Sequence, residues 1–176
     1  GCSVLGVDIN SEAIRAAQEL AVPPDAAGRS LRFAVADVAG DDPPHLVGGP
    51  FDLVVCQLVI SIIGAAHNRA NLLRHARENL RPGGRLFLSA SGVSDSINAG
   101  YAKLYADDFA LTGERHTYLS RDVRGEVLYM THHVTAEELE GLLAAAGFAD
   151  IAVATERETS SRRPDEAAFF HYATAT

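Results

Sequence analysis

The chain has 176 residues, of which 47% are hydrophobic, and its 15 Lys and Arg against 23 Asp and Glu give a formal net charge of −8. This length is typical of one domain, so we expect a single domain over residues 1–176. The acidic balance, without a cluster of basic residues, argues against nucleic acid or a membrane surface as a partner. The two cysteines form no disulfide framework, and neither a signal peptide nor an apolar run of the ~20 residues that span a membrane is present, so we expect a cytoplasmic protein.

The first half of the chain alternates predicted strands and helices. Short apolar runs followed by polar residues predict strands at 4–9, 31–36, 51–56 and 85–89. Helical spacing of apolar residues predicts helices at 11–20, with Ser11 as N-cap, and at 71–80, closed by Arg81-Pro82-Gly83-Gly84. Strands separated by helices form βαβ units, so we predict an α/β fold with a Rossmann-like, doubly wound and mainly parallel sheet.

The second half begins with a segment that lacks this periodicity. We interpret residues 91–133 as an insertion over the active-site cleft. Thr135 and Glu138 then form a capping box that opens a helix ended by Gly147. Strands follow at 151–155 and 167–173, and the polar segment between them leaves no room for a helix, so the sheet is expected to end in an antiparallel hairpin.

Polar side chains follow three of the predicted parallel strands: Asp8, Asp37 and Gln57. In open parallel sheets, ligands bind beyond the carboxyl ends of the strands. An ionised Asp accepts hydrogen bonds from two donors, so Asp8 suits both hydroxyls of a ribose, and Asp37 is placed to accept from an adenine amino group. The sequence therefore predicts an adenine nucleoside across the sheet.

Four segments, in this order, resemble successive motifs of the class I S-adenosylmethionine-dependent methyltransferases: 4–10, 36–38, 51–57 and 80–86. The resemblance implies S-adenosyl-L-methionine as cofactor and methyl transfer to a small-molecule acceptor held under residues 91–133. It also implies cofactor contacts by position: Asp8 to the ribose hydroxyls, Ile9 to the adenine face, Asp37 and Val38 to the adenine edge, and Gln57 near the methionine moiety.

The family's first, central strand and its glycine-rich loop have no counterpart in the chain, whose only methionine is Met130. We therefore expect the sequence to begin inside something longer and the sheet to lack its first central strand. The absent strand would leave two inner edges unpaired, each a row of backbone groups that need partners. Three hypotheses account for this: the chain is a fragment, it pairs with a segment of another chain or with itself, or the two edges close on each other.

His132 and His133 are candidate catalytic residues, because a base is needed when a methyl acceptor arrives protonated and His titrates near neutral pH. Two adjacent histidines without a carboxylate at ligand spacing give no basis for a metal site. The remaining histidines are expected at surface or cap positions: His45, His67, His75, His116 and His171.

Other functions stay open at this point. A related aminopropyltransferase would need further acidic residues, which residues 58–64 do not offer. An NAD-binding domain also has an acid after its second strand, but Asp37 and the terminal hairpin argue against it. The last alternative is a non-catalytic or incomplete nucleoside-binding module. The net charge favours a neutral or cationic acceptor over an anionic one.

Overall fold

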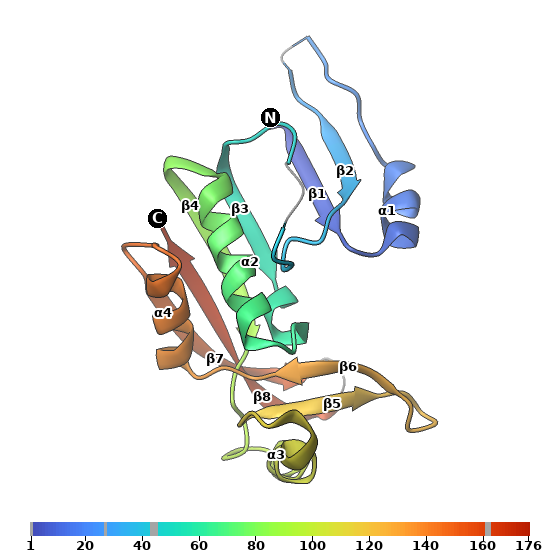
Figure 1. The fold of residues 1–176 in the computed structure, drawn as a ribbon, viewed down its shortest axis with the longest axis vertical. Helices are drawn as coiled ribbons and strands as arrows, with labels where there is room; N and C mark the ends of the chain where they lie inside the picture. The colour runs from blue at the N-terminus through green and yellow to red at the C-terminus, as the bar shows by residue number, and fades with distance from the viewer. Residues whose placement is uncertain (1, 27, 43–45, 161–162) are drawn as a thin grey trace.

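A computed structural model describes residues 2–26, 28–42, 46–160 and 163–176 (Figure 1). Within these ranges the strands form three sheets, and the largest has the order β3-β4-β8-β7. Its β3–β4 pair is parallel, whereas β4–β8 and β7–β8 are antiparallel, so the predicted C-terminal hairpin is confirmed. The bounds of these strands are β3 Phe51–Gln57, β4 Leu80–Ser91, β7 Ala152–Ser160 and β8 Arg163–Ala175.

The two smaller sheets have two strands each. β1 (Val4–Asp8) pairs in parallel with β2 (Leu31–Val35), and β5 (Thr117–Arg121) pairs antiparallel with β6 (Val127–His132). The fold is therefore α/β as predicted, but its strands are divided among separate sheets. The prediction of a mainly parallel sheet is wrong, since three of the five strand pairings in the described residues are antiparallel. Figure 1 shows the β1–β2 pair set apart from β3.

Four α-helices and one short 3₁₀ helix, η1, are present in the described residues: α1 Ser11–Gln18, η1 Val59–Ile62, α2 Ala66–Asn79, α3 Ala99–Thr112 and α4 Ala136–Ala145. The capping box of α4 is confirmed, since Thr135 Oγ1 accepts from the Glu138 N–H at 3.1 Å. The N-cap predicted for α1 is wrong by one residue. Asn10 is the cap, because its Oδ1 accepts from the amides of Glu12 and Ala13. None of these helices is long and apolar enough to cross a membrane.

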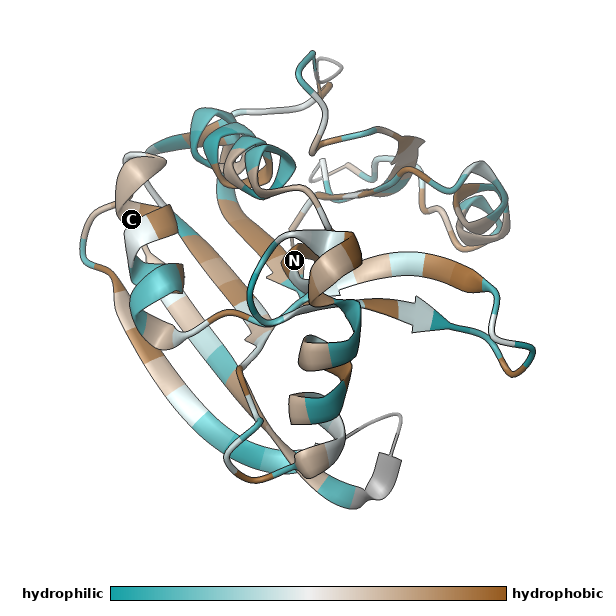
Figure 2. Ribbon diagram, turned by 60° about the horizontal axis from the view of Figure 1, so that its bottom comes forward, coloured by the Kyte–Doolittle hydropathy of each residue, from teal (hydrophilic) through white to brown (hydrophobic). Residues whose placement is uncertain are grey.

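Helices α2 and α4 cover one face of the four-stranded sheet (Figure 1). The core between them is formed by alternate strand residues and by leucines of both helices, among them Leu73, Leu86, Leu139 and Leu143, all fully buried. Figure 2 shows brown, hydrophobic stretches along the strands and teal, hydrophilic stretches along the helices. Each helix therefore buries only one stripe against the sheet.

The opposite face of this sheet is open. Its strands expose large apolar side chains there: Leu53, Val55, Phe87 and Tyr172. A hollow of about 520 Å³ on this face is lined by residues of β3, β4, β7 and β8 and reaches Gln57. An exposed apolar patch of this kind indicates a surface that another segment covers.

The inner edges of β1 and β3 have no partner strand within the described ranges. There β1 pairs only with β2, and β3 pairs only with β4. The hypothesis that the two edges close on each other is therefore wrong. A strand pair needs the two backbones about 5 Å apart, and the chain between β2 and β3 does not bring β1 and β3 into that register.

The segment 91–133 is more regular than predicted, since it contains α3, β5 and β6. It lies beyond the carboxyl ends of β3 and β4 (Figure 1). Helix α3 was not predicted because its buried side chains include the carboxylate of Asp108 beside Tyr101 and Tyr105. Other boundaries also differ. α2 begins at Ala66 rather than at Asn71, β4 begins at Leu80 and includes the predicted turn before Arg85, and the polar segment after Thr155 continues β7.

Candidate functional site

Asp8 and Asp37 lie at the same edge of the β1–β2 sheet. The parallel register places Asp8 opposite Val35, and the Asp8 carbonyl accepts from the Ala36 N–H at 3.0 Å. Asp37 follows directly, so both carboxylates leave the carboxyl ends of adjacent strands. Both residues are exposed. The structure thus brings together the two acids that the sequence predicts to bind one nucleoside.

Each carboxylate is oriented by the turn that follows it. Asp8 Oδ1 accepts from the Asn10 N–H at 2.7 Å, and Asp37 Oδ1 accepts from the amides of Ala39 and Gly40 at 3.0 and 3.1 Å. Among the described contacts, the Oδ2 atoms of both residues accept no hydrogen bond. One oxygen of each carboxylate is thereby fixed, and the other can accept from a ligand hydroxyl or amino group.

The other predicted cofactor residues lie on both sides of the space between the unpaired edges of β1 and β3. Ile9 is 68% exposed beside Asp8, so its side chain is accessible to a flat ring, whereas Val38 is half-buried and packs on the core. Gln57 is exposed at the end of β3, on the far side. The next residue, Leu58, has φ 59°, a left-handed conformation that is strained for leucine. Such strain often accompanies a functional turn.

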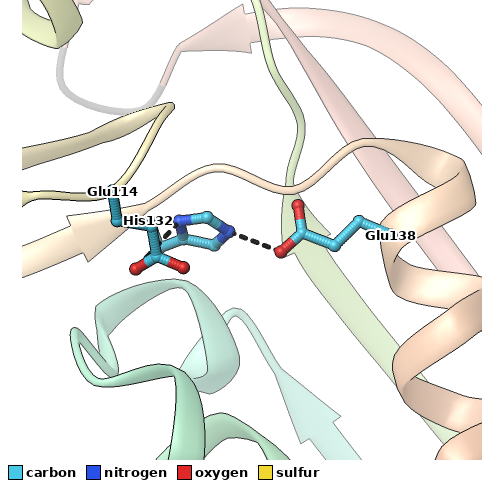
Figure 3. A group of neighbouring side chains, drawn as sticks. All are labelled: Glu114, His132 and Glu138. Atoms are coloured by element: carbon cyan, nitrogen blue, oxygen red, sulfur yellow. Dashed lines mark hydrogen bonds and ion pairs between the residues drawn. The ribbon is translucent and has the colours of Figure 1, made fainter.

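His132 lies buried between two carboxylates (Figure 3). Its Nε2 is 2.9 Å from Glu138 Oε1, and its Nδ1 is 2.7 Å from Thr117 Oγ1 and 3.8 Å from Glu114 Oε2. Burial alone would raise the pKa of Glu138, but the hydrogen bond to His132 and the fields of His132 and Arg69 outweigh it, so this pKa lies below its ordinary value. Both ring nitrogens of His132 have partners, so it can reach a methyl acceptor only if one of them moves.

Glu114, His132 and Glu138 each place one ligand atom within 4.8 Å of the others, a spacing that a metal ion could use. No spacing pattern in the sequence indicates this cluster. However, the two carboxylates approach opposite nitrogens of one imidazole ring, whereas a metal needs its ligand atoms to converge on one centre. Arg69 also pairs with Glu114. The geometry fits a hydrogen-bonded chain of polar side chains better than a metal centre.

His133 is enclosed by three tyrosines. The ring centroids of Tyr101, Tyr118 and Tyr105 lie 4.8, 5.3 and 5.7 Å from that of His133, all edge-on. Burial and the neighbouring histidines lower the pKa of His133 to about 3, so the ring is neutral at pH 7. Burial also raises the pKa of Tyr105, whose hydroxyl is 2.6 Å from Nδ1 and donates to it. The His133 ring is buried at the end of the insertion, and its role as a catalytic base stays a prediction.

The expectation for the remaining histidines is partly wrong. His75 and His171 are buried, at 2% and 4% exposure, because their ring nitrogens find backbone carbonyls as partners. His67 is exposed, and His116 is half-buried at the start of β5. His45 lies outside the described residues.

Two exposed acids at the carboxyl ends of adjacent parallel strands are typical of Rossmann-like folds that bind adenosine cofactors. Within this class, the family model described as "Methyltransferase domain" matches residues 1–86. The chain contains a class I S-adenosylmethionine-dependent methyltransferase domain. No curated protein matches the sequence.

Solved structures of methyltransferases resemble the chain over nearly its whole length. An S-adenosylmethionine-dependent methyltransferase from Methanosarcina mazei is 26% identical with a TM-score of 0.83, over 99% of this chain and 82% of that one. One from Mesorhizobium loti is 18% identical with a TM-score of 0.60, over 100% and 81%. The 1,6-didemethyltoxoflavin-N1-methyltransferase from Burkholderia thailandensis, with bound 1,6-didemethyltoxoflavin and S-adenosylhomocysteine, is 20% identical with a TM-score of 0.58, over 98% and 60%.

Proposed function

We propose that this domain transfers a methyl group from S-adenosyl-L-methionine to a small-molecule acceptor. The observation that carries this proposal is the pair of exposed carboxylates, Asp8 and Asp37, each held by its own turn at the ends of adjacent parallel strands. Asp8 binds the ribose hydroxyls, Asp37 and Val38 bind the adenine edge, and Ile9 packs on the adenine face. Gln57 lies near the methionine moiety.

The acceptor binds under the insertion 91–133. This segment lies beyond the carboxyl ends of β3 and β4 (Figure 1), the edge at which open parallel sheets bind their ligands. Methyl transfer is an in-line displacement, so the main task of the protein is to hold the acceptor atom at attack distance from the methyl group. The B. thailandensis enzyme, which has a small heterocycle bound, supports a small acceptor.

A further strand lies between β1 and β3 in the active protein. The two unpaired edges and the open apolar face with Leu53, Val55 and Phe87 support this part of the proposal. The strand can come from the same protein or from a partner, and its loop would approach the methionine moiety. Without it, we expect the domain to bind the cofactor weakly and to be inactive.

Calorimetric titration of the full-length protein with S-adenosylhomocysteine and, separately, with NAD tests the proposal. We expect S-adenosylhomocysteine alone to bind. Asp8→Ala removes charged hydrogen bonds to the ribose and should weaken binding by at least about 1.5 kcal/mol. The matched control is Asp52→Ala, because Asp52 is exposed near the amino end of β3 and pairs with Arg81 on the surface. Binding of NAD instead, or equal affinity of the Asp8 and Asp52 variants, would refute the proposal.

The second candidate is a nucleoside-binding module without catalysis, which the gap beside β3 favours. It predicts binding of S-adenosylhomocysteine but no turnover of S-adenosylmethionine with any acceptor. Supplying a strand that completes the sheet separates the two: the enzyme gains activity, whereas the module does not.

A further inference from the structure

Helix α2 connects the two parts of the molecule that no strand pairing joins within the described residues. It covers β3 and β4, and its side chains also reach loop 37–41, which follows β2. This loop contains Asp37 and Val38, the two residues that the proposed function assigns to the adenine edge. The contacts between α2 and the loop come from Asn71 and His75, one helical turn apart.

His75 holds the backbone of Val38. Its Nδ1 is 3.0 Å from the Val38 carbonyl oxygen. A carbonyl only accepts, so Nδ1 carries the hydrogen and donates it. His75 is 2% exposed, and its Nε2 has no hydrogen-bond partner in the part of the chain that the structure describes. Among the described residues, the one polar interaction of this buried ring is thus with the loop.

Asn71 holds the next three residues of the loop. Its Nδ2 donates to Asp41 Oδ1 at 2.9 Å and lies 3.3 and 3.4 Å from the carbonyl oxygens of Gly40 and Ala39. Its Oδ1 accepts from Arg74 Nη2 at 3.2 Å, which fixes the orientation of the amide.

The same stretch of backbone orients the carboxylate of Asp37. The amides of Ala39 and Gly40 donate to Asp37 Oδ1, while their carbonyl oxygens face Asn71. A shift of these peptide units away from α2 would therefore turn the carboxylate as well. The geometry of the adenine edge depends on α2, although no side chain of α2 is assigned a contact with the cofactor.

We propose that Asn71 and His75 are positioning residues for the adenine end of the cofactor, a role that rests on the function proposed above. They place Asp37 and the Val38 backbone relative to the four-stranded sheet, and so relative to Gln57 and the acceptor side. Their contribution to cofactor affinity is indirect and passes through loop 37–41.

Two substitutions of His75 separate positioning from packing. His75→Asn puts a side-chain N–H at the place of Nδ1, whereas His75→Leu fills more of the space but cannot donate. If the hydrogen bond matters, S-adenosylhomocysteine should bind about fivefold more weakly to the Leu variant, and the Asn variant should recover most of the loss. If His75 only fills space, the Leu variant should bind better than the Asn variant, and the proposal is then overturned.

Asn71→Ala is the second test, and it carries the proposal alone if the buried His75→Leu variant does not fold. We expect a similar weakening of S-adenosylhomocysteine binding. Arg77→Ala is the matched control: Arg77 lies on the same helix and donates to a loop carbonyl, that of Gly147 at 3.2 Å, far from loop 37–41 along the chain. Equal effects of the Asn71 and Arg77 substitutions would overturn the proposal.

Hydrogen–deuterium exchange of the full-length protein without cofactor provides an independent readout. The amides of Ala39 and Gly40 should exchange faster in Asn71→Ala and His75→Leu than in the unsubstituted protein or in Arg77→Ala. Unchanged exchange, or faster exchange with unchanged affinity, refutes the positioning role. If the unsubstituted protein does not bind S-adenosylhomocysteine, the proposed function fails and the positioning role fails with it. If it binds and the variants bind equally well, only the positioning role fails.

Discussion

The guanidinium of Arg69, buried in α2, pairs with the carboxylate of Glu114 in the insertion. The same side chain donates through Nη1 to the carbonyl oxygens of Ile63 at 3.1 Å and Gly64 at 2.7 Å. One arginine therefore ties the insertion to the loop that follows η1. Because Glu114 also faces Thr117 and His132, this contact continues into the chain of polar side chains that ends at Glu138.

Arg69→Met should lower the free energy of unfolding by about 3 kcal/mol, because it leaves a carboxylate and two carbonyls without their buried donor. Urea denaturation followed by circular dichroism measures this. Arg74→Met is the control, since Arg74 forms an exposed pair with Glu78 on the same helix and should change stability by less than about 0.5 kcal/mol. Similar losses of unfolding free energy in both variants would show that the buried Arg69 contacts contribute no more to stability than the exposed Arg74 pair.

The neutral, buried His133 should make stability depend on pH. Its pKa is lowered to about 3 in the folded protein, so between that value and the ordinary pKa of histidine only the unfolded chain takes up the proton. Stability is therefore lost as pH falls below about 6.5. From pH 7 to pH 5 this single group should account for about 2 kcal/mol of that loss.

Urea unfolding of the unsubstituted protein and of His133→Gln at both pH values checks this. The variant should lose less stability on acidification. His116 and His171, whose pKa values are also lowered by burial, should leave part of the dependence in place. A variant with the full dependence of the parent would contradict the assignment to His133.

Asp108 should contribute stability that acid removes. The Arg121 guanidinium, at 2.6 and 2.9 Å, and the Leu119 N–H, at 2.8 Å, hold the pKa of this buried carboxyl below its usual range. A lowered carboxyl pKa gives stability that is present above about pH 4 and is lost as pH falls through the folded value. Asp108→Asn should therefore reduce stability at pH 7 and flatten the acid limb of a stability profile. An acid limb as steep as that of the parent would refute this.

Two glycine substitutions should act in opposite directions. A Cβ at Gly64 would lie 2.6 Å from Met130 Cβ, so Gly64→Ala must displace β6 from the loop after η1 and should cost about 2 kcal/mol of stability. A Cβ at Gly141, in α4, would meet no atom within 4 Å, and Gly141→Ala should stabilise the helix by about 0.5–1 kcal/mol. Thermal unfolding of both variants and of the unsubstituted protein tests these two predictions. A Gly64→Ala protein as stable as the unsubstituted one would contradict the close contact between Gly64 and Met130.

The first three strands were predictable because their signal is local. The apolar runs at 4–9, 31–36 and 51–56 form strands close to their expected bounds, whereas β4 begins five residues before its predicted start. Thr135 caps α4 as its spacing with Glu138 predicts. Helix α3 was missed because a buried carboxylate interrupts its apolar stripe. Asp108 occupies a core position only because Arg121 reaches it from β5. The contact between Asp108 and Arg121 cannot be predicted from a local sequence pattern.

The candidate site also has features that the sequence could predict and features that it could not. That Asp8 and Asp37 lie close together could be predicted because each follows a strand directly, and parallel strands bring their carboxyl ends to one edge. Glu114 and Glu138 could not be linked to His132, and His75 could not be linked to Val38, since these pairs meet only when α2, α4 and the insertion pack on the sheet.

The sequence by itself determined the strand and helix pattern of the first half of the chain, the position of two acids at the ends of adjacent strands and the resemblance to methyltransferases. Only the tertiary structure decided that the sheet is open between β1 and β3 and that α2 holds loop 37–41 through Asn71 and His75. The physical reason is the distance along the chain over which each kind of interaction acts. Periodicity and capping act over a few residues of chain, whereas buried hydrogen bonds between distant segments form only after those segments have packed together.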